Sequence, residues 1–192
     1  MRRCVVSESQ NRFHFPRLYL NRNLRQVPDN QEVFLYPDSS ISMIVEVLER
    51  VPQNEDDGAA RFDGPSISLM ICPIMISRFH FDSLAHDNSA LSSSVESVTK
   101  TWNERGDKTP SPTVLKGTQL VRKFNSTVPD KIYILLALFR VESKNADLVL
   151  SMNIPPHTAE GDINEDKSHQ AQCDFETAVE SLQIIKFDLF AG

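Results

Sequence analysis

The feature that most constrains the fold is an almost entirely apolar run at residues 131–141, KIYILLALFRV. A strand with apolar side chains on both faces has to be covered on both faces, as the central strands of a sheet are. Polar residues 142–145 follow it, and residues 146–154 then alternate in hydrophobicity as a strand does. Because the link is so short, the pattern predicts an antiparallel hairpin in a sheet that is covered on two sides.

Helical periodicity supplies candidates for this cover. Residues 171–187 place apolar side chains at the spacing of one helix face, namely Phe175, Ala178, Val179, Leu182 and Ile185. A shorter helical spacing begins at Phe81 and continues at Leu84 and Ala85, which would put Asp82 in a first turn. We therefore expect one helix near the middle of the chain and another near the C-terminus.

Weaker patterns complete the expected sheet. Residues 33–36 and 118–124 are predicted strands, and residues 41–51 fit either a helix face or a strand face, with their β-branched content favouring a strand. The serine-rich residues 89–97 are interpreted as a helix end and loop, and the acidic residues 157–170 as a loop. The sum predicts the α+β class, as an α/β/α sandwich with a mainly antiparallel sheet covered by helices on both faces.

The composition argues against several kinds of partner. The chain has 192 residues and a net charge of −6, and this acidic balance disfavours nonspecific nucleic-acid binding, which needs a basic surface. No apolar run reaches the roughly 18 residues of a membrane-spanning helix. The three cysteines, Cys4, Cys72 and Cys173, form no disulfide or metal-binding pattern. We therefore expect no nucleic acid, membrane or metal among the ligands.

Catalytic motifs are missing as well. The sequence contains neither a glycine-rich phosphate loop nor a G-x-S-x-G elbow. His80 and His86 have a poor spacing for two metal ligands on one helix face, and the phenylalanines on both sides of His80 favour a packing or surface role. Catalytic residues, a cofactor and enzymatic function are therefore not expected.

The segment 24–34, LRQVPDNQEVF, carries the most informative polar residues. Pro28 disfavours helix for the residue before it, and aspartate and asparagine directly after it are turn formers. Two carboxylates and two amides at positions 29–32 thus stand where a turn leads into a strand. Spacing alone fits a solvated turn better than an interaction surface.

Segment 24–34 resembles the signature of the Ran guanine nucleotide release factor family, the Mog family. Residues 78–88, 134–141, 146–155 and 175–190 are similar to further segments of that family and follow in the same order. The resemblance implies an α/β/α sandwich of the Mog/PsbP-like kind. It also implies binding to the small GTPase Ran, promotion of guanine-nucleotide release and a role in nucleocytoplasmic transport.

The same resemblance implies that the signature contacts Ran through Asp29, Asn30, Gln31 and Glu32, with Arg25 upstream. Along an extended segment Asp29 and Gln31 would point one way and Asn30 and Glu32 the other, unless the turn rotates them together. We expect a monomeric GTPase regulator, found in the nucleus and cytoplasm, without catalytic chemistry of its own. A trafficking adaptor or scaffold on the same fold, without nucleotide-release activity, is the alternative.

Two segments depart from the family pattern. Residues 1–23 contain no Gly-Gly sequence like that of the family's first strand. We therefore expect an atypical N-terminal segment in which this strand is missing, replaced, or hidden by a mispredicted gene start. Residues 24–192 are expected to form a single domain. Within it, residues 62–77 look like an insertion, either a retained intron or a lineage-specific loop, whose apolar side chains would be exposed.

Overall fold

The computed structural model describes residues 19–20, 30–36, 39–51, 65–122, 127–158, 161–162 and 165–190. Its strands (β), helices (α) and short 3-10 helices (η) are β1 (Tyr19–Leu20), β2 (Gln31–Leu35), β3 (Ser42–Glu49), α1 (Pro65–Asp87), β4 (Ala90–Lys100), β5 (Thr113–Val121), β6 (Asp130–Val141), η1 (Glu142–Lys144), β7 (Ala146–Ile154), β8 (His157–Thr158), β9 (Gly161–Asp162), α2 (Glu165–Ser181) and η2 (Phe187–Phe190). The main sheet has seven strands in the order β1-β2-β3-β7-β6-β5-β4, and every neighbouring pair is antiparallel.

The predicted hairpin forms the middle of this sheet. β6 and β7 pair antiparallel, and η1 joins them together with Asn145, which adopts a left-handed backbone with φ of 49°. Asparagine tolerates this conformation better than most residues do, so it suits the turn. β6 is buried from Ile134 to its end, as the apolar run predicts.

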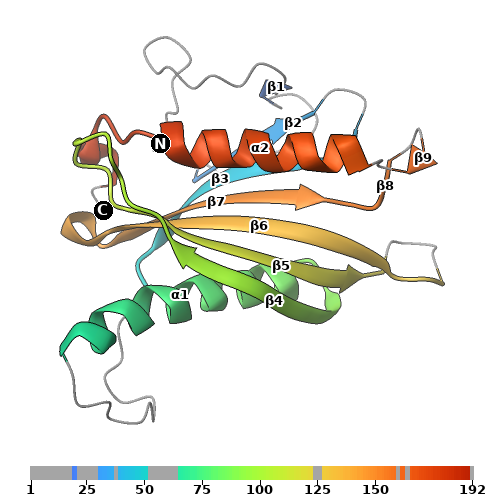
Figure 1. Ribbon diagram of the computed structural model, residues 1–192, viewed down its shortest axis with the longest axis horizontal. Helices are drawn as coiled ribbons and strands as arrows, with labels where there is room; N and C mark the ends of the chain where they lie inside the picture. Colours follow the sequence, from blue (N-terminus) through green and yellow to red (C-terminus); the bar gives the residue numbers. More distant parts are fainter. Residues whose placement is uncertain are drawn as a thin grey trace.

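The two long helices lie on opposite faces of the sheet (Figure 1). α1 packs against β4, β5 and β6, whereas α2 packs against β6 and β7. On the α2 side, Phe175 and Ala178 of the helix share a core with side chains of β2, β3, β6 and β7. On the α1 side, Ile76 and Phe81 share a core with side chains of β5, β6 and β7. The predicted antiparallel sandwich is confirmed.

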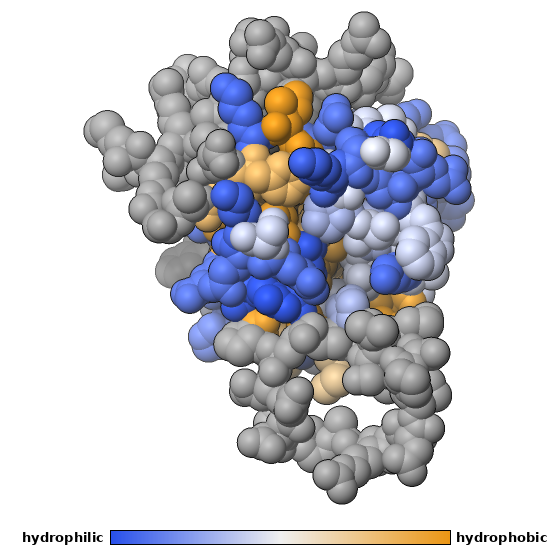
Figure 2. Space-filling model, turned by 90° about the vertical axis from the view of Figure 1, so that its left-hand side faces the viewer, coloured by the Kyte–Doolittle hydropathy of each residue, from blue (hydrophilic) through white to orange (hydrophobic). Residues whose placement is uncertain are grey.

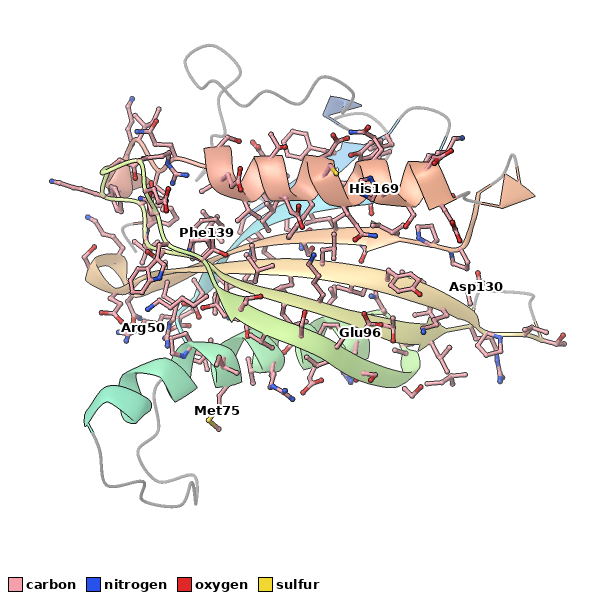
Figure 3. The ribbon with its side chains drawn as sticks, viewed as in Figure 1. Arg50, Met75, Glu96, Asp130, Phe139 and His169 are labelled. Atoms are coloured by element: carbon pink, nitrogen blue, oxygen red, sulfur yellow. The ribbon has the colours of Figure 1, made fainter. Side chains whose placement is uncertain are left out.

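Helix α1 is much longer than its sequence pattern predicts. It begins at Pro65, so Asp82 lies in its C-terminal part, and the expectation of a first turn at Asp82 is wrong. The amphipathic period is hidden because the helix carries apolar side chains on two sides: Ile76 is buried, whereas Met75 is half exposed and points away from the sheet (Figure 3). That residues 62–77 are an insertion stays a prediction, and those from Pro65 onward are helical.

The serine-rich segment 89–97 is mostly strand, so its interpretation as a helix end and loop is wrong. Strand β4 occupies it, pairs with β5 and forms an outer edge of the sheet. Most of its side chains are exposed and the others are half-buried, so polar residues are tolerated and the apolar alternation of a strand is weak. Register shifts next to Ala90 and Val95 interrupt the alternation further.

Helix α2 begins and ends earlier than the predicted range 171–187. Its first turn carries Glu165 and Asp166, whose negative charges favour the positive N-terminal end of a helix dipole. The predicted loop at 157–170 is therefore wrong in its second part, and it also holds the two-residue strands β8 and β9, which pair with each other.

At the edge of the sheet opposite β4, β1 pairs with β2 over two residues. The other residues of the segment 1–23 lie outside the described part of the chain, so its departure from the family pattern stays a prediction. None of the described helices has the length and hydrophobicity needed to cross a membrane.

Candidate functional site

The structure describes three of the five residues that the sequence predicts to bind a partner. Arg25 and Asp29 lie outside the described residues. Asn30 occupies a turn immediately before β2, and Gln31 and Glu32 are the first residues of that strand. The signature therefore does lead from a turn into a strand near one edge of the sheet.

Asn30 extends the pairing of β2 with β3. Its carbonyl oxygen accepts a hydrogen bond of 2.9 Å from the N–H of Val47, and its Nδ2 donates one of 3.1 Å to the carbonyl oxygen of Val47. The side-chain amide thus adds one bond to the ladder between the two strands. Asn30 therefore holds the start of β2 in place. This structural role could not be predicted from its position in a polar turn.

Gln31 is bonded to a carboxylate outside the sequence motif. Its Nε2 donates a hydrogen bond of 2.7 Å to Oε1 of Glu46, which lies directly opposite on β3. Both side chains are half-buried, so the amide restricts the carboxylate while leaving it partly open to solvent. Sequence reasoning missed Glu46, because only the register between β2 and β3 brings it beside the signature.

Successive side chains of β2 point to opposite faces of the sheet. Phe34 belongs to the core on the α2 side, so Glu32, two residues earlier, points to that side. Gln31 and Glu46 point to the α1 side, because Val149, opposite Glu46 on β7, belongs to the core there. The alternation expected between Gln31 and Glu32 is therefore present, and each face of the sheet carries a carboxylate at this edge.

The far end of the signature strand is tied to helix α2. Oη of Tyr36 donates a hydrogen bond of 2.5 Å to Oδ2 of Asp174, and Nε2 of Gln170 donates one of 2.9 Å to Oδ1 of the same carboxylate. Tyr36 also packs against the core on the α2 side. The signature strand is thus anchored beyond both of its ends, to β3 through Asn30 and to α2 through Tyr36.

A buried ionic cluster joins α1 to the central hairpin. Oδ2 of Asp147 on β7 lies 3.0 Å from Nε2 of His80 and accepts a hydrogen bond of 3.2 Å from the N–H of Val51. Its Oδ1 accepts a hydrogen bond of 3.2 Å from Nε of Arg140, whose terminal nitrogen donates to the carbonyl oxygen of Val51 at 2.8 Å. The cluster therefore fixes α1 and the chain just after β3 to the sheet.

The environment of Asp147 keeps its carboxylate charged. Burial alone would raise the pKa of Asp147, but the hydrogen bonds from His80 and from the N–H of Val51, with the charge of Arg140, hold that pKa below its ordinary value. The cluster lies next to the turn between β6 and β7. Most of the described residues seen at that end of the molecule are hydrophilic (Figure 2).

A histidine bonded to a carboxylate also occurs in nucleophilic triads. Here both side chains are buried, and the second carboxylate oxygen is occupied by Arg140. His80 has the packing role that its sequence context favours. Within the described ranges no group of three His, Cys, Asp or Glu side chains is placed to hold a metal ion.

Comparison with known proteins gives a consistent result. The model of a family described as "Ran-interacting Mog1 protein" matches residues 14–155. The Ran guanine nucleotide release factor of Homo sapiens is 31% identical over 175 residues, covering 88% of this chain and 84% of the relative. That of Danio rerio is 28% identical over 182 residues, covering 87% of each chain.

Two further proteins extend the comparison. The nuclear import protein mog1 of Schizosaccharomyces pombe is 30% identical over 157 residues, covering 76% of this chain and 73% of the relative. The crystal structure of the Saccharomyces cerevisiae Ran-binding protein Mog1p superposes with a TM-score of 0.56 at 18% identity, covering 92% of this chain and 90% of the other. At that identity the likeness shows a shared fold.

Proposed function

The chain belongs to the Ran-interacting Mog1 protein family, and from this premise we propose that it binds the small GTPase Ran and promotes release of its guanine nucleotide. The family match spans residues 14–155, which include the signature and all strands of the main sheet. Relatives that carry the name of a Ran guanine nucleotide release factor cover most of the chain. A role in nucleocytoplasmic transport, in the nucleus and cytoplasm, follows from that activity.

The proposed contact surface is the start of β2 with the neighbouring part of β3. It comprises the signature residues Arg25, Asp29, Asn30, Gln31 and Glu32, and Glu46 in addition. The observation that supports it best is the hydrogen bond from Gln31 to Glu46, because it holds a partly exposed carboxylate beside the signature. Carboxylates so placed suit lysine and arginine side chains of a GTPase.

The mechanism is thermodynamic linkage. A protein that binds nucleotide-free Ran more tightly than loaded Ran weakens nucleotide binding by the same factor. It needs neither a catalytic residue nor a cofactor of its own, because the energy comes from differential binding. A single copy of the chain suffices for this scheme, so we propose a monomer that regulates a GTPase.

A nucleotide-release assay tests the proposal. Ran loaded with a fluorescent guanine nucleotide is mixed with excess unlabelled nucleotide and with the wild-type protein, the Glu46→Lys variant or the Asp29→Ala/Glu32→Lys variant. The wild-type protein should accelerate release. The acceleration by each variant should be smaller by about tenfold or more, since like charges then meet across the interface.

The control is Glu96→Lys, which makes the same charge change on β4 (Figure 3), at the opposite edge of the sheet. It should release nucleotide as wild type does. A wild-type protein that binds Ran without accelerating release would be an adaptor and would refute the proposed activity. Normal acceleration by both Glu46→Lys and Asp29→Ala/Glu32→Lys would refute the proposed surface.

A further inference from the structure

Neither helix covers the whole of the sheet face on which it lies. On the α1 side, the helix packs on β4, β5 and β6, and its core reaches β3 at Leu48. Farther from α1 on that face lie Val33 and Leu35 of β2 and Ile44 of β3. Val33 and Ile44 are directly opposite each other. These three side chains are half-buried, and among the described residues they belong to neither core.

The same face carries the Gln31–Glu46 pair. Ile44 is opposite Ser151 and Glu46 is opposite Val149 on β7, so both β3 side chains point toward the α1 side. Side chains two positions apart on a strand share a face, which places Val33 beside Gln31 and Ile44 beside Glu46. The apolar residues and the carboxylate are therefore contiguous. We call Gln31, Val33, Leu35, Ile44 and Glu46 the β2–β3 strip.

Resting on the proposed function, we infer that the β2–β3 strip is the apolar centre of the GTPase interface. Stable interfaces combine a small apolar centre, which supplies most of the affinity, with charged residues near the rim, which steer association. Carboxylates alone would give binding that fades as salt screens them. The three apolar side chains of the strip supply the part that salt does not screen.

The strip also defines the chemistry of its partner segment. Glu46 would pair with a lysine or arginine of the partner. Val33 and Ile44 would pack against an aliphatic or aromatic side chain of the same partner segment, about one residue spacing from that basic residue. The segment on the GTPase therefore presents a basic residue beside an apolar one. A purely basic segment would leave the apolar residues of the strip without a counterpart.

The test compares Ile44→Thr with Ile132→Thr. Both replace a half-buried isoleucine on the same face of the sheet, but Ile132 packs in the core under α1, away from the strip. Binding of nucleotide-free Ran is measured by surface kinetics at low and high salt, together with thermal unfolding and molecular mass in solution. Ile44→Thr should raise Kd about tenfold, mainly through faster dissociation and equally at both salt concentrations.

Ile132→Thr should lower the unfolding temperature and leave Kd unchanged. Wild-type affinity in a folded Ile44→Thr protein would overturn the inference, as would a change in self-association in place of a change in Ran binding. The two proposals fail in different ways. If the wild-type protein does not bind Ran, the proposed function fails. If Glu46→Lys weakens Ran binding as expected but Ile44→Thr does not, only the inference of an apolar centre fails.

Discussion

Nε2 of His80 lies 3.0 Å from Oδ2 of Asp147, in a contact that joins α1 to β7 with both side chains buried. The other oxygen of Asp147 is held by Arg140. A single carboxylate thus contacts two basic side chains that α1 and β6 bring into the interior. Removing the charge of Asp147 would leave Arg140 buried with a weaker partner, which is far more costly than removing an exposed ion pair.

We predict that Asp147→Asn lowers the free energy of unfolding by about 3–5 kcal/mol. The comparison is Glu176→Gln, which breaks the exposed pair between Lys116 and Glu176, 3.1 Å apart, and should cost under about 1 kcal/mol. Urea unfolding of the three proteins measures both values. Equal losses in the two variants would show that the buried cluster is not a main support of the fold.

The pH dependence of stability should follow from two carboxyl groups. Burial would raise the pKa of Asp107, but hydrogen bonds from the Thr109 N–H and from Arg105 and Asn103 lower it to about 2. The pKa of Asp147 is lowered as well. Because the folded-state pKa lies below the unfolded value of 3.8, each group stabilises the fold fully above that value and loses its contribution as pH falls through the folded-state pKa.

Wild type should therefore lose stability between about pH 5 and pH 2, and Asp147→Asn should lose less over the same range. Unfolding free energies measured in steps from pH 7 to pH 2 test this. Parallel curves for the two proteins would contradict the charged state assigned to Asp147.

Gly117 sets how closely α1 approaches the sheet. A Cβ at this position would lie 2.7 Å from the carbonyl oxygen of Ser94 and 2.8 Å from a ring carbon of Phe81. Gly117→Ala should therefore destabilise the protein by about 1–3 kcal/mol, since either β4 or the helix must move. Gly106→Ala, where no atom lies within 4 Å but φ is 75°, isolates the backbone cost alone. Denaturation midpoints measure how much each substitution destabilises the protein. A Gly117→Ala protein as stable as wild type would contradict the close contact.

The Tyr36–Asp174 bond should be important for the signature strand. Tyr36→Phe removes the 2.5 Å hydrogen bond but keeps the ring in the core, so it should cost about 1 kcal/mol of stability. Gln170→Ala, which removes the exposed bond to the other oxygen of Asp174, should cost less. Thermal unfolding of both variants gives the comparison, and equal losses would argue against an anchoring role of Tyr36.

The central hairpin could be predicted because its information is local: an apolar run, a short polar turn and an alternating segment lie next to one another. The ends of α1 and α2 and the identity of β4 could not. α1 has apolar residues on two sides and β4 is largely exposed, so neither shows the contrast between faces on which periodicity depends.

The candidate site shows the same division. The signature around Gln31 and Glu32 could be recognised by resemblance, because it is a run of consecutive residues. Glu46 joins the site only through strand register, and the bond between His80 and Asp147 links residues 67 positions apart. Tertiary contacts of this kind leave no local pattern, so the sequence predicts a packing or surface role for His80 without indicating its partner.

The most direct test of the account is the affinity of the wild-type protein for Ran in its nucleotide-free and nucleotide-loaded forms, measured in one titration assay at one salt concentration. Linkage requires tighter binding to nucleotide-free Ran, by the same factor by which the protein weakens nucleotide binding. Glu46→Lys should reduce the affinity for nucleotide-free Ran and, with it, that factor. Equal affinities of the wild-type protein for the two forms of Ran would contradict the proposed release activity.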